Sequence, residues 1–212
     1  ALVGTGFTYL MTAAGAGLVF LFRTLNRNVL SLMLGFASGV MIAASFWSLL
    51  DPAIVQAEQN GDIAWLVVAI GFGLGGLFLY AADKILPHIH FGSNHEEEGI
   101  PSHFKRTILL VFSITLHNIP EGMAVGVAFG GIATGVPGMT LIGAIMLALG
   151  IGIQNFPEGA AVSLPLRTEG YSRSKSFMIG QASALVEPIS AVIGAILVIY
   201  IRSIMPFLLA FA

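Results

Sequence analysis

Long apolar runs separated by short polar stretches make up most of the chain. Six of them have the length of a membrane span: residues 1–22, 30–50, 63–86, 105–129, 138–164 and 174–200. At a helical rise of about 1.5 Å per residue, about 20 residues cross the roughly 30 Å hydrocarbon core of a bilayer. Another apolar run, residues 204–212, is too short to cross. The pattern predicts an all-α polytopic bundle of transmembrane helices, with six complete spans and the start of a seventh.

Glycines recur four positions apart within three of these runs. The sets are Gly35 and Gly39, Gly71 and Gly75, and Gly122, Gly126 and Gly130. This spacing puts small residues on one face of a helix and lets a neighbouring backbone approach closely. We therefore expect these glycines to mark close helix contacts.

The composition agrees with a membrane protein and excludes other classes. Of the 212 residues, 56% are hydrophobic and only 9% are charged, and cysteine is absent. An ordinary soluble domain, a disulfide framework and a thiolate metal site are therefore not expected. No basic tract indicates a nucleic-acid partner, and no phosphate-binding Gly-x4-Gly-Lys-Ser/Thr loop indicates an ATP-driven pump. We expect one transmembrane domain over residues 1–212, with the lipid bilayer as its partner.

Basic residues gather on one side of the predicted bundle. Eight of the nine lie near the connections after the first, third and fifth spans: Arg23, Arg27, Lys84, Lys105, Arg106, Arg167, Arg173 and Lys175. Because cytoplasmic loops carry an excess of Lys and Arg, this side is predicted to be cytoplasmic. The N-terminus would then lie outside, and the fourth and fifth spans would run in opposite directions.

Two near-copies of one motif lie inside the fourth and fifth runs. The first reads His-Asn-Ile-Pro-Glu-Gly at residues 117–122, and the second reads Gln-Asn-Phe-Pro-Glu-Gly at residues 154–159. A charged residue near the bilayer centre costs about 2.5–3.5 kcal/mol on insertion scales, so each motif glutamate is a candidate functional residue. Repeated motifs on antiparallel spans predict a pseudo-symmetric pair of helices, broken at the prolines, around a midplane site.

The residue types of the two motifs suit a divalent transition metal. His117 and Glu121 are four positions apart and share a helical face, as do Gln154 and Glu158. An imidazole with carboxylates and amide oxygens fits such a metal better than Mg²⁺ or Ca²⁺, which favour oxygen ligands alone. The alternative is an internally satisfied polar network or a proton relay.

Two further spans offer candidate ligands. In the second span, Met41 shares a stripe with Ser45 and Ser48; a methionine stripe is also typical of core packing. In the sixth span, Glu187 precedes Pro188. Glu187 could be a ligand of a second metal, a proton acceptor or a partner for another polar group.

The connection at residues 87–104 is rich in histidine and glutamate. It holds His88, His90, His95 and His103 beside three consecutive glutamates at 96–98. We expect a flexible cytoplasmic loop. It is either a linker with incidental histidines or a weak, reversible metal collector or sensor.

The paired motifs, the Glu-Pro of the sixth span and the histidine-bearing loop resemble the ZIP family of divalent metal transporters. The resemblance covers the whole chain. It implies a transporter domain of eight helices, the last two apparently missing here, and uptake of Zn²⁺ toward the cytoplasm by alternating access, with helices one, four, five and six moving as a unit. It also implies a homodimer in a bacterial inner membrane. Its main metal site lies between helices two, four and five.

Site residues are carried over from the resemblance by position. The main site would comprise Met41, His117, Glu121, Gln154 and Glu158. A second metal site would comprise Asn118, Asn155 and Glu187, with Glu121 and Glu158 bridging the two ions. Bacterial relatives with two metals often carry an acid where this chain has Asn155, so the second site would be weaker here.

We therefore expect a secondary, ATP-independent importer of Zn²⁺ and related divalent ions, with Cd²⁺, Fe²⁺ and Mn²⁺ unranked, and with metal as substrate rather than cofactor. One competing hypothesis is an intramembrane metalloenzyme. The lack of a His-Glu-x-x-His motif and of a second histidine in any predicted span argues against it. The other is a membrane metal sensor that transports nothing.

Overall fold

The protein is described by a computed structural model that covers residues 1–23, 26–85, 106–200 and 204–211. The nine α-helices of this part are α1 (Leu2–Gly17), α2 (Arg27–Ser45), α3 (Asp51–Asn60), α4 (Ala64–Ile85), α5 (Arg106–Ala133), α6 (Leu141–Thr168), α7 (Arg173–Ala182), α8 (Val186–Tyr200) and α9 (Met205–Phe211). No strand occurs among these residues. The all-α prediction is confirmed. The histidine-rich segment 87–104 lies outside the described residues, and so do the four histidines predicted to bind metal there.

Five helical segments of the described part are long and apolar enough to cross a membrane. They are Leu2–Phe20, Asn28–Asn60, Ala64–Ala81, Leu141–Thr168 and Arg173–Tyr200. The fourth predicted span corresponds to α5, which has 28 residues and therefore a length of about 42 Å. A polytopic helical bundle is thus confirmed, and its last helix, α9, occupies the predicted start of a seventh span.

The second and sixth spans differ from the predicted pattern. The second continues past its predicted end, and the sixth is interrupted. The second does not end at residue 50, because a π-helical turn, Phe46–Leu50, leads directly into α3. Pro52 closely follows this π-helical turn, so its missing N–H falls where the α-helical hydrogen-bond ladder is already interrupted. The sixth span is interrupted by a 3₁₀ turn, Ser183–Leu185, just before Glu187. In contrast, α5 and α6 continue as α-helices through Pro120 and Pro157, so the expected breaks at these prolines are not found.

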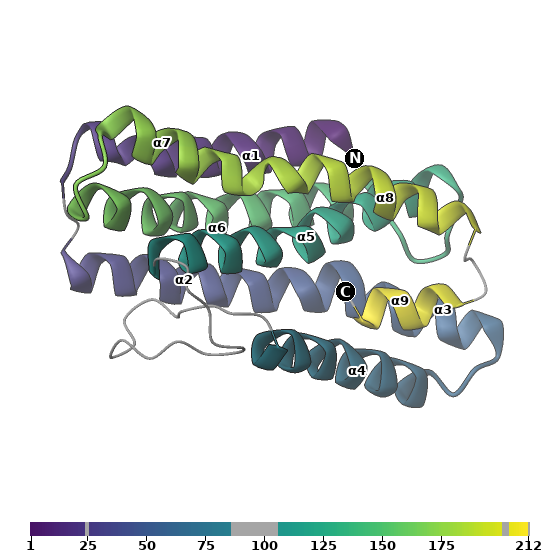
Figure 1. Ribbon diagram of the computed structural model, residues 1–212. Coiled ribbons are helices and arrows are strands. Elements are labelled where there is room, and N and C mark those ends of the chain that lie inside the picture. Colours follow the sequence, from purple (N-terminus) through teal and green to yellow (C-terminus); the bar gives the residue numbers. More distant parts are fainter. Residues whose placement is uncertain (24–25, 86–105, 201–203, 212) are drawn as a thin grey trace.

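Helix α6 occupies the middle of the bundle. It packs against α1, α2, α5 and α7, while α5 packs along α8. Figure 1 shows α2, α3, α4 and α9 on the side opposite α1, α7 and α8, and α9 lies along α4. The two motif-bearing helices therefore lie inside the bundle, between these two groups.

Glycines bring helices into backbone contact in this arrangement. A Cβ on Gly126 would lie 2.1 Å from the Ala191 carbonyl oxygen of α8, and one on Gly75 would lie 2.3 Å from the Phe211 carbonyl oxygen of α9. The close contacts predicted for these two sets are confirmed. The set on α2 differs, because Gly35 and Gly39 have no neighbouring atom within 4 Å of the added Cβ.

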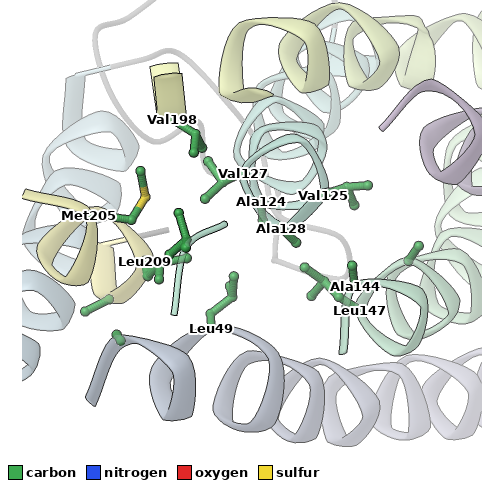
Figure 2. Packing of buried hydrophobic residues seen from close by; sticks show 14 of the residues in the cluster. Leu49, Ala124, Val125, Val127, Ala128, Ala144, Leu147, Val198, Met205 and Leu209 are labelled. Atoms are coloured by element: carbon green, nitrogen blue, oxygen red, sulfur yellow. The ribbon is translucent and has the colours of Figure 1, made fainter. Parts of the chain in front are cut away.

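An apolar cluster fixes the position of α9 against the rest of the bundle. Met205 and Leu209 of α9 are buried beside Leu49 of the π-turn, Val127 of α5 and Val198 of α8 (Figure 2). Between helices in a bilayer, such side chains stabilise mainly through van der Waals packing against one another. The polar motif residues of α5 lie further toward the start of that helix, so the apolar cluster and the polar site occupy different levels of the bundle.

Candidate metal site

The first motif copy places an imidazole beside a buried carboxylate on α5. His117 Nε2 lies 3.3 Å from Glu121 Oε1, as the four-residue spacing predicts. Their surroundings differ sharply, since the side chain of His117 is 55% exposed and that of Glu121 only 4%. The histidine therefore stands at the edge of the site and the glutamate inside it.

The second motif copy reaches across from α6 to this carboxylate. Gln154 Nε2 donates hydrogen bonds to Glu121 Oε1, at 2.5 Å, and to Asn155 Oδ1, at 2.7 Å. One amide nitrogen thus uses both of its hydrogens on acceptors from the two motifs. This pair of bonds links α5 to α6 at the level of the two motifs.

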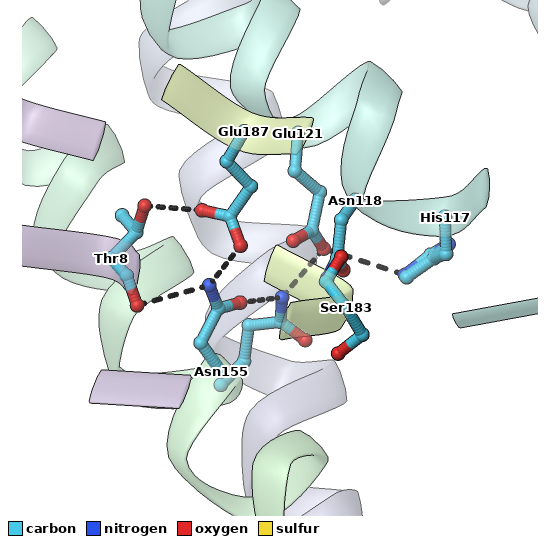
Figure 3. Close-up of polar contacts among 8 residues, drawn as sticks. Thr8, His117, Asn118, Glu121, Asn155, Ser183 and Glu187 are labelled. Atoms are coloured by element: carbon cyan, nitrogen blue, oxygen red, sulfur yellow. Dashed lines mark hydrogen bonds and ion pairs between the residues drawn. The ribbon is translucent and has the colours of Figure 1, made fainter. Parts of the chain in front are cut away.

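The network continues from α6 to α8 and α1. Asn155 Nδ2 donates to Glu187 Oε1 at 2.8 Å and to the Thr8 carbonyl oxygen at 3.3 Å. The Thr8 hydroxyl in turn donates to Glu187 Oε2. Figure 3 shows the resulting chain of contacts from His117 to Thr8, with the side chain of Glu187 pointing toward Thr8 and Asn155. Four helices therefore contribute to one buried polar network.

Asn118 ties the same region to the interrupted sixth span. Its side-chain amide donates to the Ser183 carbonyl oxygen at 3.1 Å. Ser183 begins the 3₁₀ turn that precedes Glu187, where the α-helical hydrogen-bond ladder is interrupted. Asn118 thus stabilises the break that sets the position of Glu187.

Four buried oxygens of the two motifs lack a hydrogen-bond donor within the part of the chain that the structure describes. They are Asn118 Oδ1, Glu121 Oε2 and both carboxylate oxygens of Glu158. Leaving such groups unpaired is costly, and the cost is larger for a charged group. All four are acceptors, and the Glu158 carboxylate interacts electrostatically with Glu121, His117 and Glu187. A cation is the kind of partner that would satisfy this set.

Comparison with known proteins shows to which family the chain belongs. A family model described as a ZIP zinc transporter matches residues 1–103 and 90–211. The chain is 39% identical to human zinc transporter ZIP11, with 100% of this chain and 84% of that protein aligned. It is 37% identical to zinc transporter GufA of Myxococcus xanthus, over 95% and 77% of the two chains, and 33% identical to zinc transporter ZupT of Streptococcus mutans serotype c, over 92% and 73%. The chain belongs to the ZIP family.

Membership in the ZIP family confirms the resemblance drawn from the two motifs. The named relatives are transporters rather than enzymes, and their family model matches both motif-bearing helices. With the apolar helices of the fold, this identifies a multi-pass membrane protein of a metal-transporting family.

The structure brings together most of the residues predicted for the site in this ZIP-family chain. His117, Glu121, Gln154, Asn155 and Glu187 share the hydrogen-bonded network. Asn118 adjoins the network through Ser183, and Glu158 interacts with it electrostatically. Met41 is partly buried and packs against the apolar cluster. Among the described residues, no three His, Cys, Asp or Glu side chains form a group that could hold a metal by themselves. Amide oxygens or a rearrangement would have to complete the coordination.

Sequence reasoning missed the contribution of α1. Thr5, Thr8 and Thr12 are fully buried, and Tyr9 donates its hydroxyl hydrogen to Gln181 Oε1 of α7. The available signal was the spacing of three threonines on one face of an apolar run, which can indicate polar contacts between membrane helices. Nothing in the motifs themselves indicated that one of these threonines would bind Glu187.

Proposed function

We propose that this ZIP-family chain transports Zn²⁺ and related divalent ions across its membrane without ATP, through a site between α5 and α6. The observation that carries the proposal is a set of four buried oxygens, on Asn118, Glu121 and Glu158, that have no hydrogen-bond donor among the described residues. Names of the relatives support zinc as the substrate. Two carboxylates can offset both the charge of the ion and the loss of its water shell.

The proposed ligands have different roles. Glu158 would bind the ion first, since neither of its oxygens accepts a hydrogen bond from the residues that the structure describes. Glu121 would contribute Oε2, while Gln154 holds its other oxygen. His117, at the exposed edge, would supply the nitrogen ligand that favours transition metals over Mg²⁺ and Ca²⁺. Met41 would supply a soft ligand only if α2 or α6 shifted to bring it to the two motifs.

Backbone contacts support the part of the hypothesis that concerns motion. Gly15 of α1 faces the Phe156 carbonyl oxygen of α6, and Gly194 of α8 faces the Met123 carbonyl oxygen of α5, each too closely for a Cβ. Helices packed backbone to backbone resist sliding past one another. We propose that α1, α5, α6 and the α7–α8 span move as one unit against α2 and α4, which would expose the site to each side in turn.

Direction, location and assembly extend the same proposal. The side that carries eight of nine basic residues would be cytoplasmic, so uptake would run toward that side. A bacterial inner membrane, a homodimer, a second bound metal and metal collection by the 87–104 loop stay predictions.

The deciding experiment is Zn²⁺ and Cd²⁺ flux into proteoliposomes. We expect saturable flux without ATP for the wild-type protein and its loss in His117→Ala and Glu121→Ala variants shown to be folded. Glu58→Gln is the matched control, because Glu58 is an exposed acid of α3 outside the network. Cleavage of a test peptide without flux would favour the enzyme, and metal binding without flux would favour the sensor. Normal flux in both variants would overturn the site.

A further inference from the structure

Glu187 is held differently from the other two glutamates of the network. It is fully buried, and each of its carboxylate oxygens accepts a hydrogen bond: Oε1 from Asn155 Nδ2 at 2.8 Å, and Oε2 from the Thr8 hydroxyl. Both donors come from helices α6 and α1, on the side away from Glu121 and His117 (Figure 3). In this arrangement its carboxylate is occupied by protein donors rather than open to a cation.

Both donors have a second acceptor on the backbone of α1. The Thr8 hydroxyl oxygen lies 3.1 Å from the Thr5 carbonyl oxygen, one turn earlier. Asn155 Nδ2 lies 3.3 Å from the Thr8 carbonyl oxygen. If the Glu187 carboxylate turned away, the Thr8 hydroxyl could donate to the Thr5 carbonyl oxygen, and Asn155 would keep its bond to the Thr8 carbonyl oxygen. Only the second hydrogen of Asn155 Nδ2 would lose its acceptor, so most of the cost of leaving buried polar groups unpaired would be avoided.

The main chain around Glu187 is fixed more firmly than its side chain. A Cβ on Gly122 would lie 2.4 Å from the Glu187 carbonyl oxygen, so α5 and α8 are in backbone contact at this residue. On the other side, a Cβ on Gly159 would lie 2.1 Å from the Thr12 carbonyl oxygen, which fixes α1 against α6. Thr8 and Asn155 therefore stay together, and the Glu187 carboxylate can change partner by side-chain rotation alone.

We propose that Thr8 is a positioning residue for metal transport, which holds Glu187 against α1 and α6 and so competes with the bound ion for this carboxylate. The proposal rests on the transport function proposed above. In the metal-loaded site Glu187 turns toward the ion, and the Thr8 hydroxyl transfers its hydrogen bond to the Thr5 carbonyl. When Glu187 returns to its hydrogen bond with Thr8, the metal site loses a ligand and the ion dissociates more easily.

The test is Zn²⁺ binding by the purified full-length chain in detergent, measured by calorimetry and paired with flux. In Thr8→Val the side chain keeps its shape and loses the hydroxyl, so the ion has one competitor fewer for the Glu187 carboxylate. We expect Zn²⁺ to bind about tenfold more tightly, which corresponds to the loss of one hydrogen bond to a charged group. Because release is slowed, flux should show a lower KM together with a lower maximal rate.

Three variants separate positioning from a structural effect. Thr8→Ser keeps the hydroxyl and should restore wild-type binding. Thr5→Val is the matched control, since Thr5 is equally buried and its hydroxyl donates to the Ala1 carbonyl oxygen, in its own helical segment. The double variant Thr8→Val with Glu187→Gln should lose the gain in affinity, because the competition is for the Glu187 carboxylate. If Thr8→Val does not insert, Thr8→Ala removes the same hydroxyl and carries the same expectation.

The possible results distinguish a failure of the transport proposal from a failure of the positioning role of Thr8. If the wild-type protein neither binds nor transports Zn²⁺, the transport function is wrong. If it does both, and Thr8→Val binds Zn²⁺ with unchanged or weaker affinity, the positioning role of Thr8 is wrong while transport stands. A gain in affinity that survives Glu187→Gln would also overturn it.

Discussion

The two copies of the motif share a scaffold but differ in what surrounds their glutamates. On α5, Glu121 accepts a hydrogen bond from Gln154 and lies beside His117. On α6, neither oxygen of Glu158 has a hydrogen-bond donor among the described residues. The same Pro-Glu-Gly sequence therefore yields one carboxylate that links helices and one that is left open. This difference indicates that repetition of a motif does not imply repetition of a role.

The scaffold itself is closely repeated. Gly122 packs against Glu187 of α8, and Gly159 packs against Thr12 of α1, in both cases too closely for any side chain. Each motif thus ends in a glycine that brings a neighbouring backbone next to its glutamate. What breaks the symmetry is the residue four positions before each glutamate. His117 remains at the exposed edge, whereas Gln154 is buried and donates across to the other copy.

The largest expected effect comes from removing the charge of each glutamate in turn. Glu158→Gln and Glu121→Gln should both lower Zn²⁺ uptake by about 100-fold or more, since each removes one of two charges that offset the ion. Their effects on the metal-free protein should be opposite. Glu158→Gln should raise the free energy of unfolding by about 1–3 kcal/mol, because it removes a buried carboxyl group whose two oxygens have no donor among the described residues. Glu121→Gln should lower it, because an amide oxygen is a weaker acceptor than a carboxylate oxygen for the hydrogen bond from Gln154.

Thermal unfolding in metal-free detergent, alongside flux, measures both quantities. A wild-type chain denatured with and without Zn²⁺ serves as the reference for the stabilisation that the ion provides. If the two variants shift the unfolding temperature in the same direction and by the same amount, the two carboxylates are equivalent, and the proposed difference between the two motif copies is wrong.

Sequence patterns predicted the bundle well because its causes are local. Apolar length gave the spans, and the four-residue spacing placed His117 next to Glu121. The effect of Pro157 on its helix could not be predicted from local sequence. Helix α6 continues through this proline while it packs against α1. The partners of Glu187 could not be predicted either. They depend on how closely α1 approaches α6, and the glycines that set this distance gave no indication of which threonine would face the carboxylate.

The shared scaffold is tested by adding a methyl group to each motif glycine. Gly122→Ala and Gly159→Ala would place a Cβ 2.4 Å from the Glu187 carbonyl oxygen and 2.1 Å from the Thr12 carbonyl oxygen, respectively. Backbone atoms cannot yield without separating the helices, so we expect each to cost about 1–3 kcal/mol or more of unfolding free energy. Gly73→Ala on α4 is the control, because its Cβ would meet nothing within 4 Å. It should be neutral or gain up to about 1 kcal/mol from helix propensity. If only one motif glycine tolerates alanine, the scaffold is not symmetric.

The smallest effect, and the sharpest test of what distinguishes the copies, is an exchange of His117 and Gln154. His117→Gln should leave stability within about 0.5 kcal/mol, since the side chain is largely exposed. It should nevertheless raise the KM for Zn²⁺ several-fold, because an amide oxygen is a poorer ligand than an imidazole nitrogen for this metal.

Gln154→His should do the opposite and act mainly on stability. Gln154 donates to Glu121 and Asn155 from one nitrogen, whereas a ring nitrogen of histidine carries at most one hydrogen. At least one of the two bonds is lost, at about 1 kcal/mol. The test measures unfolding temperature and zinc flux for the two single variants and for the double exchange. If the double exchange behaved as the wild type in both measurements, the two positions would be interchangeable, and the asymmetry between the copies would have to arise elsewhere.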